Sequence, residues 1–228
     1  MKGRHEIKHA INLTDYYVLR QRLGVMLKPD EHAGKDGVYH IRSLYFDTPE
    51  DTALREKLDG VSDRDKFRIR YYDEDTSFIQ LEKKSKRGGL CIKTSVRLTK
   101  EEAQAIVDGD IKWMKNRREP LLKELYGHML KDRLMPRTIV DYDRNPYVYA
   151  PGNVRVTLDH HIRTGLNCTD FLNPAAITIL ACEDVIILEV KWDAFLPDLV
   201  KTAVQLNSRM ASAFSKYAVC RAICNGSG

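Results

Sequence analysis

The feature that most constrains the fold is a period-two alternation of charged and aliphatic side chains. In residues 65–73, Lys66, Arg68 and Arg70 alternate with Phe67 and Ile69. Successive side chains of a β-strand point to opposite faces of the sheet, so this segment is predicted to be a strand with one charged and one apolar face. Further strands of this kind are predicted at residues 4–13, 38–46, 78–85, 89–98, 138–149, 154–160 and 185–192.

Helices and one tight turn are predicted between the strands. Thr14 is a suitable N-cap for a helix that extends to about Met26, and Thr99 with Glu102 forms a capping-box pattern. Gly88-Gly89 lies between two predicted strands and indicates a hairpin turn. Further helices are predicted at residues 120–133, 197–212 and, with Ser215 as N-cap, 216–224.

The chain is long enough for one sizeable core, and its loops are too short to be interdomain linkers. We therefore expect a single α+β domain over residues 1–224 and a flexible tail over residues 225–228. Five cysteines without a CxxC pair suit reduced, buried thiols and a cytoplasmic location. The N-terminal residues contain no apolar signal region, and no apolar run reaches the roughly 18 residues of a transmembrane helix.

The distribution of charge carries more information than its sum. The net charge is only +5, from 37 basic and 32 acidic side chains. Basic residues recur at alternate strand positions, where like charges repel unless a counter-charge is present. A bound polyanion would supply it; the alternative is an ordinary sheet whose charged face lies in water. The alternation alone does not require the sheet to close.

Three carboxylates stand out on the charged faces. Glu6, Glu82 and Glu189 each precede a lysine of the same strand face by two residues. Local charge pairing is one explanation. The other is that the carboxylates hold Mg²⁺ or Mn²⁺, which prefer oxygen ligands, while the lysines hold phosphate oxygens. The lysines are Lys8, Lys84 and Lys191.

The arginines of the charged faces suit phosphate recognition. A guanidinium group can donate to two oxygens at once, and phosphoryl transfer depends mainly on positioning and charge neutralisation. The arginines concerned are Arg68, Arg70, Arg144 and Arg155.

Other catalytic and binding patterns are absent or weak. The sequence contains no phosphate-binding glycine loop, no dinucleotide fingerprint and no nucleophile elbow. His160 and His161 are neighbours on a predicted strand, so they are expected to point to opposite faces and not to share a metal ion. His5 and His9 fall on an apolar face and are expected to be packed there. Nucleic acid is not an expected ligand, because no aromatic stacking platform accompanies the basic residues.

Several motifs together resemble the triphosphate tunnel metalloenzymes, and among them the VTC domain of polyphosphate polymerases. The resemblance covers nearly the whole chain in order. Its motifs are Glu6-Ile7-Lys8, Ser43-Leu44-Tyr45-Phe46-Asp47, Lys66-Phe67-Arg68-Ile69-Arg70-Tyr71-Tyr72, Leu81-Glu82-Lys83-Lys84, residues 138–144 and 154–159, Leu188-Glu189-Val190-Lys191 and Phe214-Ser215-Lys216-Tyr217.

The resemblance implies an eight-stranded antiparallel β-barrel, a triphosphate tunnel, with flanking helices and a C-terminal helix. It also implies transfer of the ATP γ-phosphate to a growing polyphosphate chain with Mg²⁺ or Mn²⁺. The matching positions assign phosphate contacts to Lys8, Arg68, Arg70, Lys84, Arg144, Arg155 and Lys216, and metal binding to Glu189 with help from Glu6 and Glu82. The charged faces add Arg42, Lys66, Lys93 and Lys191 as further phosphate-binding candidates.

Arg4 departs from the pattern of the hydrolytic tunnel enzymes. Those enzymes typically open with Glu-x-Glu-x-Lys, and here Arg4 stands at the first glutamate position. The exchange favours polymerase over triphosphatase. Two alternatives remain open: a metal-dependent tripolyphosphatase or nucleoside triphosphatase, and a non-catalytic module that binds polyphosphate or inositol polyphosphate. The family's eukaryotic polymerases work beside a membrane channel, so a membrane-protein partner outside this chain is also implied.

Overall fold

One curled antiparallel sheet forms the centre of the molecule. The computed structural model of the chain describes residues 3–183, 185–206, 211 and 213–224. Eight long strands follow each other across the sheet in the order β1-β10-β8-β7-β3-β4-β5-β6, which confirms the eight predicted strands. Their bounds are β1 (His5–Ile11), β3 (Tyr39–Asp47), β4 (Arg64–Tyr72), β5 (Asp75–Arg87), β6 (Leu90–Leu98), β7 (Met135–Tyr149), β8 (Val154–Thr164) and β10 (Ile186–Trp192). Two short strands, β2 (Lys28–Pro29) and β9 (Ile179–Leu180), pair with β7 and β8.

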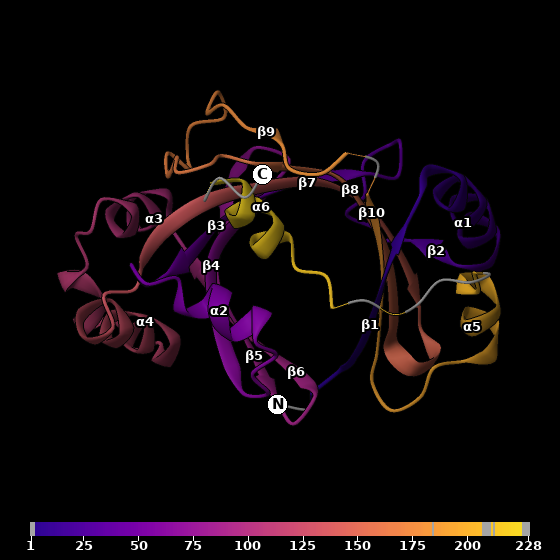
Figure 1. Ribbon diagram of the computed structural model, residues 1–228, viewed down its shortest axis with the longest axis horizontal. Helices are drawn as coiled ribbons and strands as arrows, with labels where there is room; N and C mark the ends of the chain where they lie inside the picture. The colour runs from indigo at the N-terminus through magenta and orange to yellow at the C-terminus, as the bar shows by residue number, and fades with distance from the viewer. Residues whose placement is uncertain (1–2, 184, 207–210, 212, 225–228) are drawn as a thin grey trace.

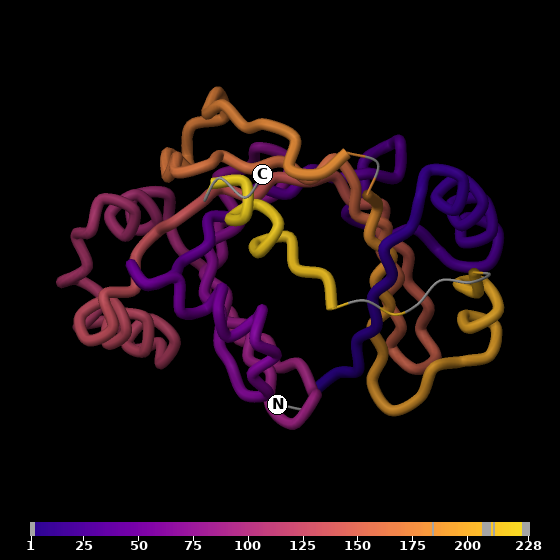
Figure 2. Tube along the Cα trace, in the orientation of Figure 1, coloured from indigo at the N-terminus to yellow at the C-terminus, as the bar shows by residue number. Residues whose placement is uncertain are grey.

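The sheet curls into a ring whose two edges meet (Figures 1 and 2). Among the described residues, the edge strands are joined by one bridge, in which Arg4 and Cys91 exchange backbone hydrogen bonds of 3.1 and 3.3 Å. The expected barrel is therefore confirmed, with a narrow closure. Gly88 and Gly89 both have positive φ and form the predicted hairpin turn between β5 and β6.

The helices form where capping residues allow them. Thr99 and Glu102 form the expected capping box, and the Ser215 hydroxyl accepts a hydrogen bond from the Ala218 N–H at 3.3 Å. The prediction of Thr14 as a cap is wrong, because Asn12 and Asp15 already form a capping box two residues earlier. The helices are α1 (Leu13–Met26), α2 (Thr52–Leu58), α3 (Lys100–Val107), α4 (Pro120–Lys131), α5 (Asp198–Val204) and α6 (Lys216–Cys224), with short 3₁₀ turns η1 (Lys112–Asn116) and η2 (Pro151–Asn153).

Two predictions are limited by the extent of the described residues. The helix expected over residues 197–212 is present only as α5, and residues 207–210 and 212 lie outside the described part of the chain. The expected tail at residues 225–228 also lies outside it. None of the described helices combines the length and apolar character needed to cross a lipid bilayer.

The aliphatic faces of most strands point outward and are covered by helices. On one side of the ring, α3 and α4 cover β4, β5 and β6, where Leu122 and Leu125 join Phe67 and Ile69 in one buried cluster (Figure 1). On the other side, α1 and α5 cover β1, β8 and β10. Each fully buried side chain of this size contributes about 1.5–3 kcal/mol. These two outer clusters fix the direction in which the charged faces point.

A third apolar cluster lies on the inner face of the sheet, which the alternation did not predict. Ile41 and Val140 pack there with Tyr217 and Cys220 of α6 and with Leu54 of α2. In Figure 2, α6 and the segment before it lie across the ring. The inner face is therefore partly apolar beneath α6, and its charged side chains occupy the remainder.

Candidate functional site

Charged side chains gather on the inner face of the sheet, which we call the tunnel. Among the described residues, ten basic side chains face four carboxylates of the strands and Asp30, which pairs with Arg155, so the negative charge is insufficient to balance the positive charge. The basic residues are Lys8, Lys66, Arg68, Arg70, Lys84, Lys93, Arg144, Arg155 and Lys191 from the strands and Lys216 from α6. The carboxylates are Glu6, Glu82, Asp159 and Glu189.

Glu6 and Glu189 form a carboxylate pair at the junction of β1 and β10. Lys8 Nζ lies 3.3 Å from an oxygen of each, and Lys191 also contacts both carboxylates. Lys84 of β5 contacts Glu6 at 2.8 Å across the seam, which is the junction of the edge strands β1 and β6. Because two carboxylates converge on the same ammonium groups, this is the place in the tunnel where oxygen ligands for a divalent cation come together.

The lysines keep this carboxylate pair ionised. Burial and the neighbouring Glu189 would raise the pKa of Glu6, but Lys8, Lys84 and Lys191 outweigh both and lower it to about 2. Burial would likewise raise the pKa of Glu189, which the same lysines hold well below its usual range. Both carboxylates are therefore anionic at neutral pH despite their burial.

Glu82 belongs to a different cluster, which corrects its grouping with the metal ligands. Its carboxylate accepts a hydrogen bond from Arg68 Nε at 2.7 Å, lies 3.0 Å from Lys93 Nζ and lies 3.9 Å from Arg70. These cations outweigh burial and hold the pKa of Glu82 well below its usual range. The placement makes Glu82 the anchor of two arginines and not a partner of Glu6.

Asp159 is a buried tunnel carboxylate that was not predicted as a site residue. Arg144 binds it through two hydrogen bonds of 2.6 and 2.7 Å, and Lys216 of α6 contacts it at 2.5 Å. Alternation along β8 puts it on the same face as Arg155, but the sequence gives no sign that α6 returns to this strand. Asp159 therefore holds both a predicted phosphate contact and the C-terminal helix.

One lysine and two arginines of the tunnel have N–H donors that no carboxylate accepts. Lys66 Nζ contacts the Ser215 hydroxyl at 3.5 Å and no carboxylate among the described residues. Arg70 donates to the Ser43 and Tyr142 hydroxyls, at 3.0 and 2.8 Å. Arg155 contacts Asp30 at 3.0 Å, yet its buried Nε has no partner. The charge of these three side chains is therefore only partly balanced by carboxylates.

Arg42 lies on the outer face of the sheet, which corrects its prediction as a phosphate contact. On β3 the inner face carries Ser43 and Tyr45, whose hydroxyls accept from tunnel arginines. Arg42 points the opposite way, binds Asp141 at 2.8 Å and donates to the Asn173 carbonyl. Arg42 is satisfied on the outer face because Asp141 of β7 and the segment between β8 and β9 supply its acceptors.

Arg4 lies at the seam of the barrel. Its backbone forms the bridge to Cys91, and its side chain binds Asp193 at 2.8 Å and donates to the Asn153 carbonyl. The residue therefore adds no carboxylate to the pair formed by Glu6 and Glu189.

His160 and His161 point to the same side of the sheet, which corrects the expectation that they diverge. The pairing of β7 with β8 shifts register between Asp141 and Asp143, and His161 has a φ of 49°. The extra residue of this β-bulge interrupts the alternation. Nδ1 atoms of the two imidazoles lie 3.1 Å apart.

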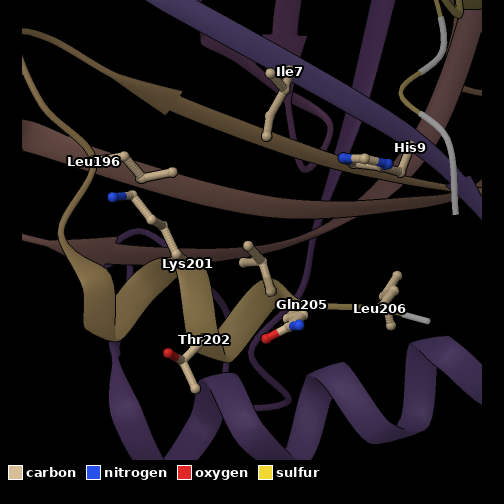
Figure 3. A pocket seen from close by; sticks show the side chains of 8 residues that line it. Ile7, His9, Leu196, Lys201, Thr202, Gln205 and Leu206 are labelled. Carbon is tan, nitrogen blue, oxygen red and sulfur yellow. The ribbon is translucent and has the colours of Figure 1, made fainter. Parts of the chain in front are cut away.

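A pocket on the outside of the ring lies apart from the tunnel. It has a volume of about 390 Å³ and is bounded by β1 and α5 (Figure 3). Its lining includes Ile7, His9 and Leu206, with Lys201 as a charged member that pairs with Asp198. This mainly apolar lining lacks the concentrated charge that distinguishes the tunnel, so we assign the pocket no role in the chemistry.

Comparison with known families agrees with the fold and the charged tunnel. Residues 3–225 match the sequence model of the VTC domain. The chain belongs to the VTC domain family. This confirms the resemblance on which the tunnel expectations rest. No curated protein matches the sequence significantly.

Solved structures share the fold of this VTC domain at low sequence identity. A Bacillus halodurans protein proposed to be an adenylate cyclase has a TM-score of 0.53 at 15% identity, over 83% of this chain and 80% of its own. A Hippeastrum protein proposed to be an adenylyl cyclase, with a reported dominant triphosphatase activity, has a TM-score of 0.54 at 16% identity, over 95% of this chain and 94% of its own. At these identities the likeness establishes the fold alone.

Proposed function

We propose that this VTC domain is a metal-dependent polyphosphate polymerase that transfers the γ-phosphate of ATP to a growing polyphosphate chain. The observation that supports it most is the surplus of tunnel cations around the carboxylate pair of Glu6 and Glu189. A polyanion of several phosphates would supply the missing counter-charge, whereas a single phosphate would neutralise only a few of these groups. A reducing, cytoplasmic setting with ATP available fits this activity.

The basic residues are proposed to hold the phosphates. Arg68 and Arg70 lie side by side on β4, and Arg144 faces them from β7 through the hydroxyl of Tyr142. Fixed guanidinium groups would stabilise the charge that spreads over the transferring phosphoryl group. Further phosphate contacts are proposed for Lys8, Lys66, Lys84, Lys93, Arg155, Lys191 and Lys216.

Glu189 and Glu6 are proposed to hold Mg²⁺ or Mn²⁺. Both are ionised and face the same point, and their oxygens are the donors that hard divalent cations prefer. Lys8 and Lys191 occupy that point in the structure, so they would shift from the carboxylates to phosphate oxygens on metal binding. A bound ion would neutralise charge on the phosphate oxygens of the donor.

The reaction needs no general base from the protein. An anionic terminal oxygen of the polyphosphate chain attacks the γ-phosphorus, the bond from that phosphorus to the β,γ-bridging oxygen breaks, and ADP leaves with the electron pair. The acceptor grows by one phosphate and no proton is transferred. The protein aligns the two ends and neutralises charge, which is most of what phosphoryl transfer requires.

Incubation of the protein with ATP, Mn²⁺ and a short polyphosphate primer tests the proposal. Gel electrophoresis should show long polyphosphate, and Glu189→Gln should abolish it while anion binding persists. Glu31→Gln is the matched control, because the Glu31 side chain is 88% exposed and its pair is with the neighbouring His32 and not with a tunnel cation. Absence of polymer with wild-type protein under several metals and primers would exclude a polymerase.

Two other outcomes correspond to the alternative functions. Release of orthophosphate without chain growth would indicate a tripolyphosphatase or nucleoside triphosphatase, an activity of the kind reported for the Hippeastrum protein. Tight binding of polyphosphate or inositol polyphosphate without turnover, unaffected by Glu189→Gln, would indicate a binding module.

A further inference from the structure

A second group of potential metal ligands lies on the outer face of the sheet. Asp143 of β7 and His160 and His161 of β8 each offer one ligand atom, and these atoms all lie within 4.8 Å of one another. His161 Nδ1 is 2.8 Å from Asp143 Oδ2 and 3.1 Å from His160 Nδ1. The group combines residues from two strands and depends on the β-bulge that turns both imidazoles to one side.

The hydrogen bonds of Asn145 orient His160 for ligation. The Asn145 amide nitrogen donates to the Gly37 carbonyl at 3.0 Å, so its Oδ1 is the acceptor that faces Tyr16 and His160. His160 Nε2 lies 3.1 Å from this oxygen and must donate its N–H to it. In the neutral imidazole, Nδ1 then carries a lone pair directed at His161. Metal-binding histidines are typically held in this way by a partner on the other ring nitrogen.

The spacing of the ligand atoms matches a small coordination sphere. Nitrogen and oxygen ligands about 2.0–2.2 Å from a zinc ion are separated by about 3.0 Å in octahedral and about 3.4 Å in tetrahedral geometry. The observed separations of 2.8 and 3.1 Å are close to these values. The third separation, between the ligand atoms of His160 and Asp143, is within 4.8 Å. Side-chain movements that bring these two atoms closer would therefore let all three contact one ion.

The backbone at His161 supports a specific role for this arrangement. Its φ of 49° lies in the left-handed region, which costs energy for a residue with a side chain. β-bulges that redirect side chains are common beside functional sites. A glycine would relieve this strain, yet the chain places a histidine there beside a second histidine and an aspartate.

We propose that Asp143, His160 and His161 form a binding site for a divalent transition-metal ion, Zn²⁺ in the first instance. Two imidazoles and one carboxylate favour borderline ions such as Zn²⁺ over Mg²⁺. Three protein ligands leave a coordination position for water or an external ligand. His40 adds an outer support, because its Nδ1 lies 3.0 Å from the other oxygen of Asp143.

The site is separate from the tunnel but shares its strands. Asp143 lies between the tunnel residues Tyr142 and Arg144 on β7, and His160 follows Asp159 on β8. Alternation directs these neighbours to the opposite face of the sheet. A metal ion at this site would therefore join β7 and β8 directly behind the bond between Arg144 and Asp159.

Isothermal titration with ZnCl₂, in excess MgCl₂ to occupy hard-ligand sites, tests the proposal. Wild-type protein and Glu189→Gln should each bind one equivalent of Zn²⁺, and CoCl₂ should give visible ligand-field absorption. His161→Gly and Asp143→Asn should weaken zinc binding by at least about tenfold, because even the loss of an outer partner of a ligand lowers metal affinity by about that much. Glycine suits the positive φ, so His161→Gly is expected to fold.

His128→Ala is the matched control. His128 of α4 pairs with Asp132, which follows the helix, at 2.6 Å, so it has the same imidazole–carboxylate contact without a second imidazole. Its removal should leave zinc binding unchanged. Failure of the wild-type protein to bind Zn²⁺ at millimolar concentration, displacement of Zn²⁺ by Mg²⁺, or equal binding by His161→Gly and Asp143→Asn would each overturn the proposal.

Discussion

Lys66 differs from the other tunnel lysines because it has no carboxylate partner among the described residues. Burial is the main cause that lowers its pKa; Tyr45 opposes this, Arg64 and Lys57 add to it, and the pKa falls to about 8. Burial would raise the pKa of Tyr45, but Arg68 and Arg70 lower it, also to about 8. Both groups therefore titrate near physiological pH in the ligand-free protein.

We predict that tripolyphosphate binding weakens as the pH rises from 7 to 9. Over this range Lys66 loses its positive charge and Tyr45 gains a negative charge, so both changes disfavour an anion. The loss of one charged hydrogen bond corresponds to roughly a tenfold rise in Kd. Titration calorimetry across the range, without metal, measures it.

Two variants separate these groups from the ionisation of tripolyphosphate itself. Lys66→Arg keeps its charge at every pH tested and should flatten the profile, and Tyr45→Phe should remove the remaining part. Ionisation of the ligand affects all variants equally. A profile that is identical in wild type and both variants would contradict the role of Lys66 and Tyr45.

Asp159 is fully buried between the cations Arg144 and Lys216. Asp159→Asn should lower the free energy of unfolding by about 3–5 kcal/mol, since it leaves Arg144 and Lys216 buried without a counter-charge. Asp198→Asn, which removes an exposed pair with Lys201, should have a much smaller effect, because exposed ion pairs add little to stability. Urea denaturation compares them, and equal effects would count against a buried ionic anchor.

The alternation predicts which residues share a face but not which face is inside. For β1 and β10 the inner assignment of Glu6 and Glu189 is correct, because the aliphatic faces of these strands are covered by α1 and α5. For β3 it fails at Arg42, where a loop with polar groups covers the outer face. His161 could not be predicted, because a one-residue bulge leaves no mark in the sequence pattern.

At the scale of elements, the seam between β1 and β6 is the weakest part of the barrel. The two strands share one backbone bridge among the described residues, whereas β3 and β7 pair over nine positions. Side-chain contact across the seam comes from Lys84 and Glu6. Edge strands with unpaired backbone groups open more readily than central strands.

The rate of amide hydrogen exchange should therefore differ between the edge and the centre of the sheet. Amides of β6 are expected to exchange faster than those of β3 and β7, and tripolyphosphate should slow exchange in β1 and β6 while leaving β7 unchanged. The ligand is expected to act there because Lys8, Lys84 and Lys93 would bind it from both sides of the seam. Uniform exchange across the sheet, or protection confined to β7, would show that the seam does not behave as an opening edge.

The C-terminal helix α6 shows how element prediction and placement differ. Its bounds, residues 216–224 with Ser215 as N-cap, were predicted correctly. Its position was not predictable, because the contacts from Tyr217 to Asp47 at 2.6 Å and from Arg221 to Asp51 at 2.9 Å join residues 170 positions apart. Such long-range pairs leave no local periodicity.

At the scale of the whole molecule, the positive charge is concentrated in the tunnel. The surplus of basic over acidic side chains there is about as large as the chain's net charge of +5, so the rest of the protein is nearly balanced. Self-repulsion of buried cations opposes the compact state until a counter-ion binds. The ligand is therefore expected to affect global stability as well as local order.

Tripolyphosphate at 100 times its Kd should stabilise the folded protein by about 2.7 kcal/mol, which corresponds to a rise in Tm of about 5–10 °C for a chain of this length. Orthophosphate at equal charge concentration should give a much smaller rise, because it cannot bridge the separate cation clusters. Glu189→Gln should have a lower Tm without ligand and a larger rise with it, since Lys8 and Lys191 lose a counter-charge that the ligand replaces.

Differential scanning calorimetry at low and high NaCl measures these shifts. Sodium chloride should reduce the tripolyphosphate effect by screening. A rise of the same size with orthophosphate, or one insensitive to salt, would show that the tunnel cations do not act together on a single polyanion.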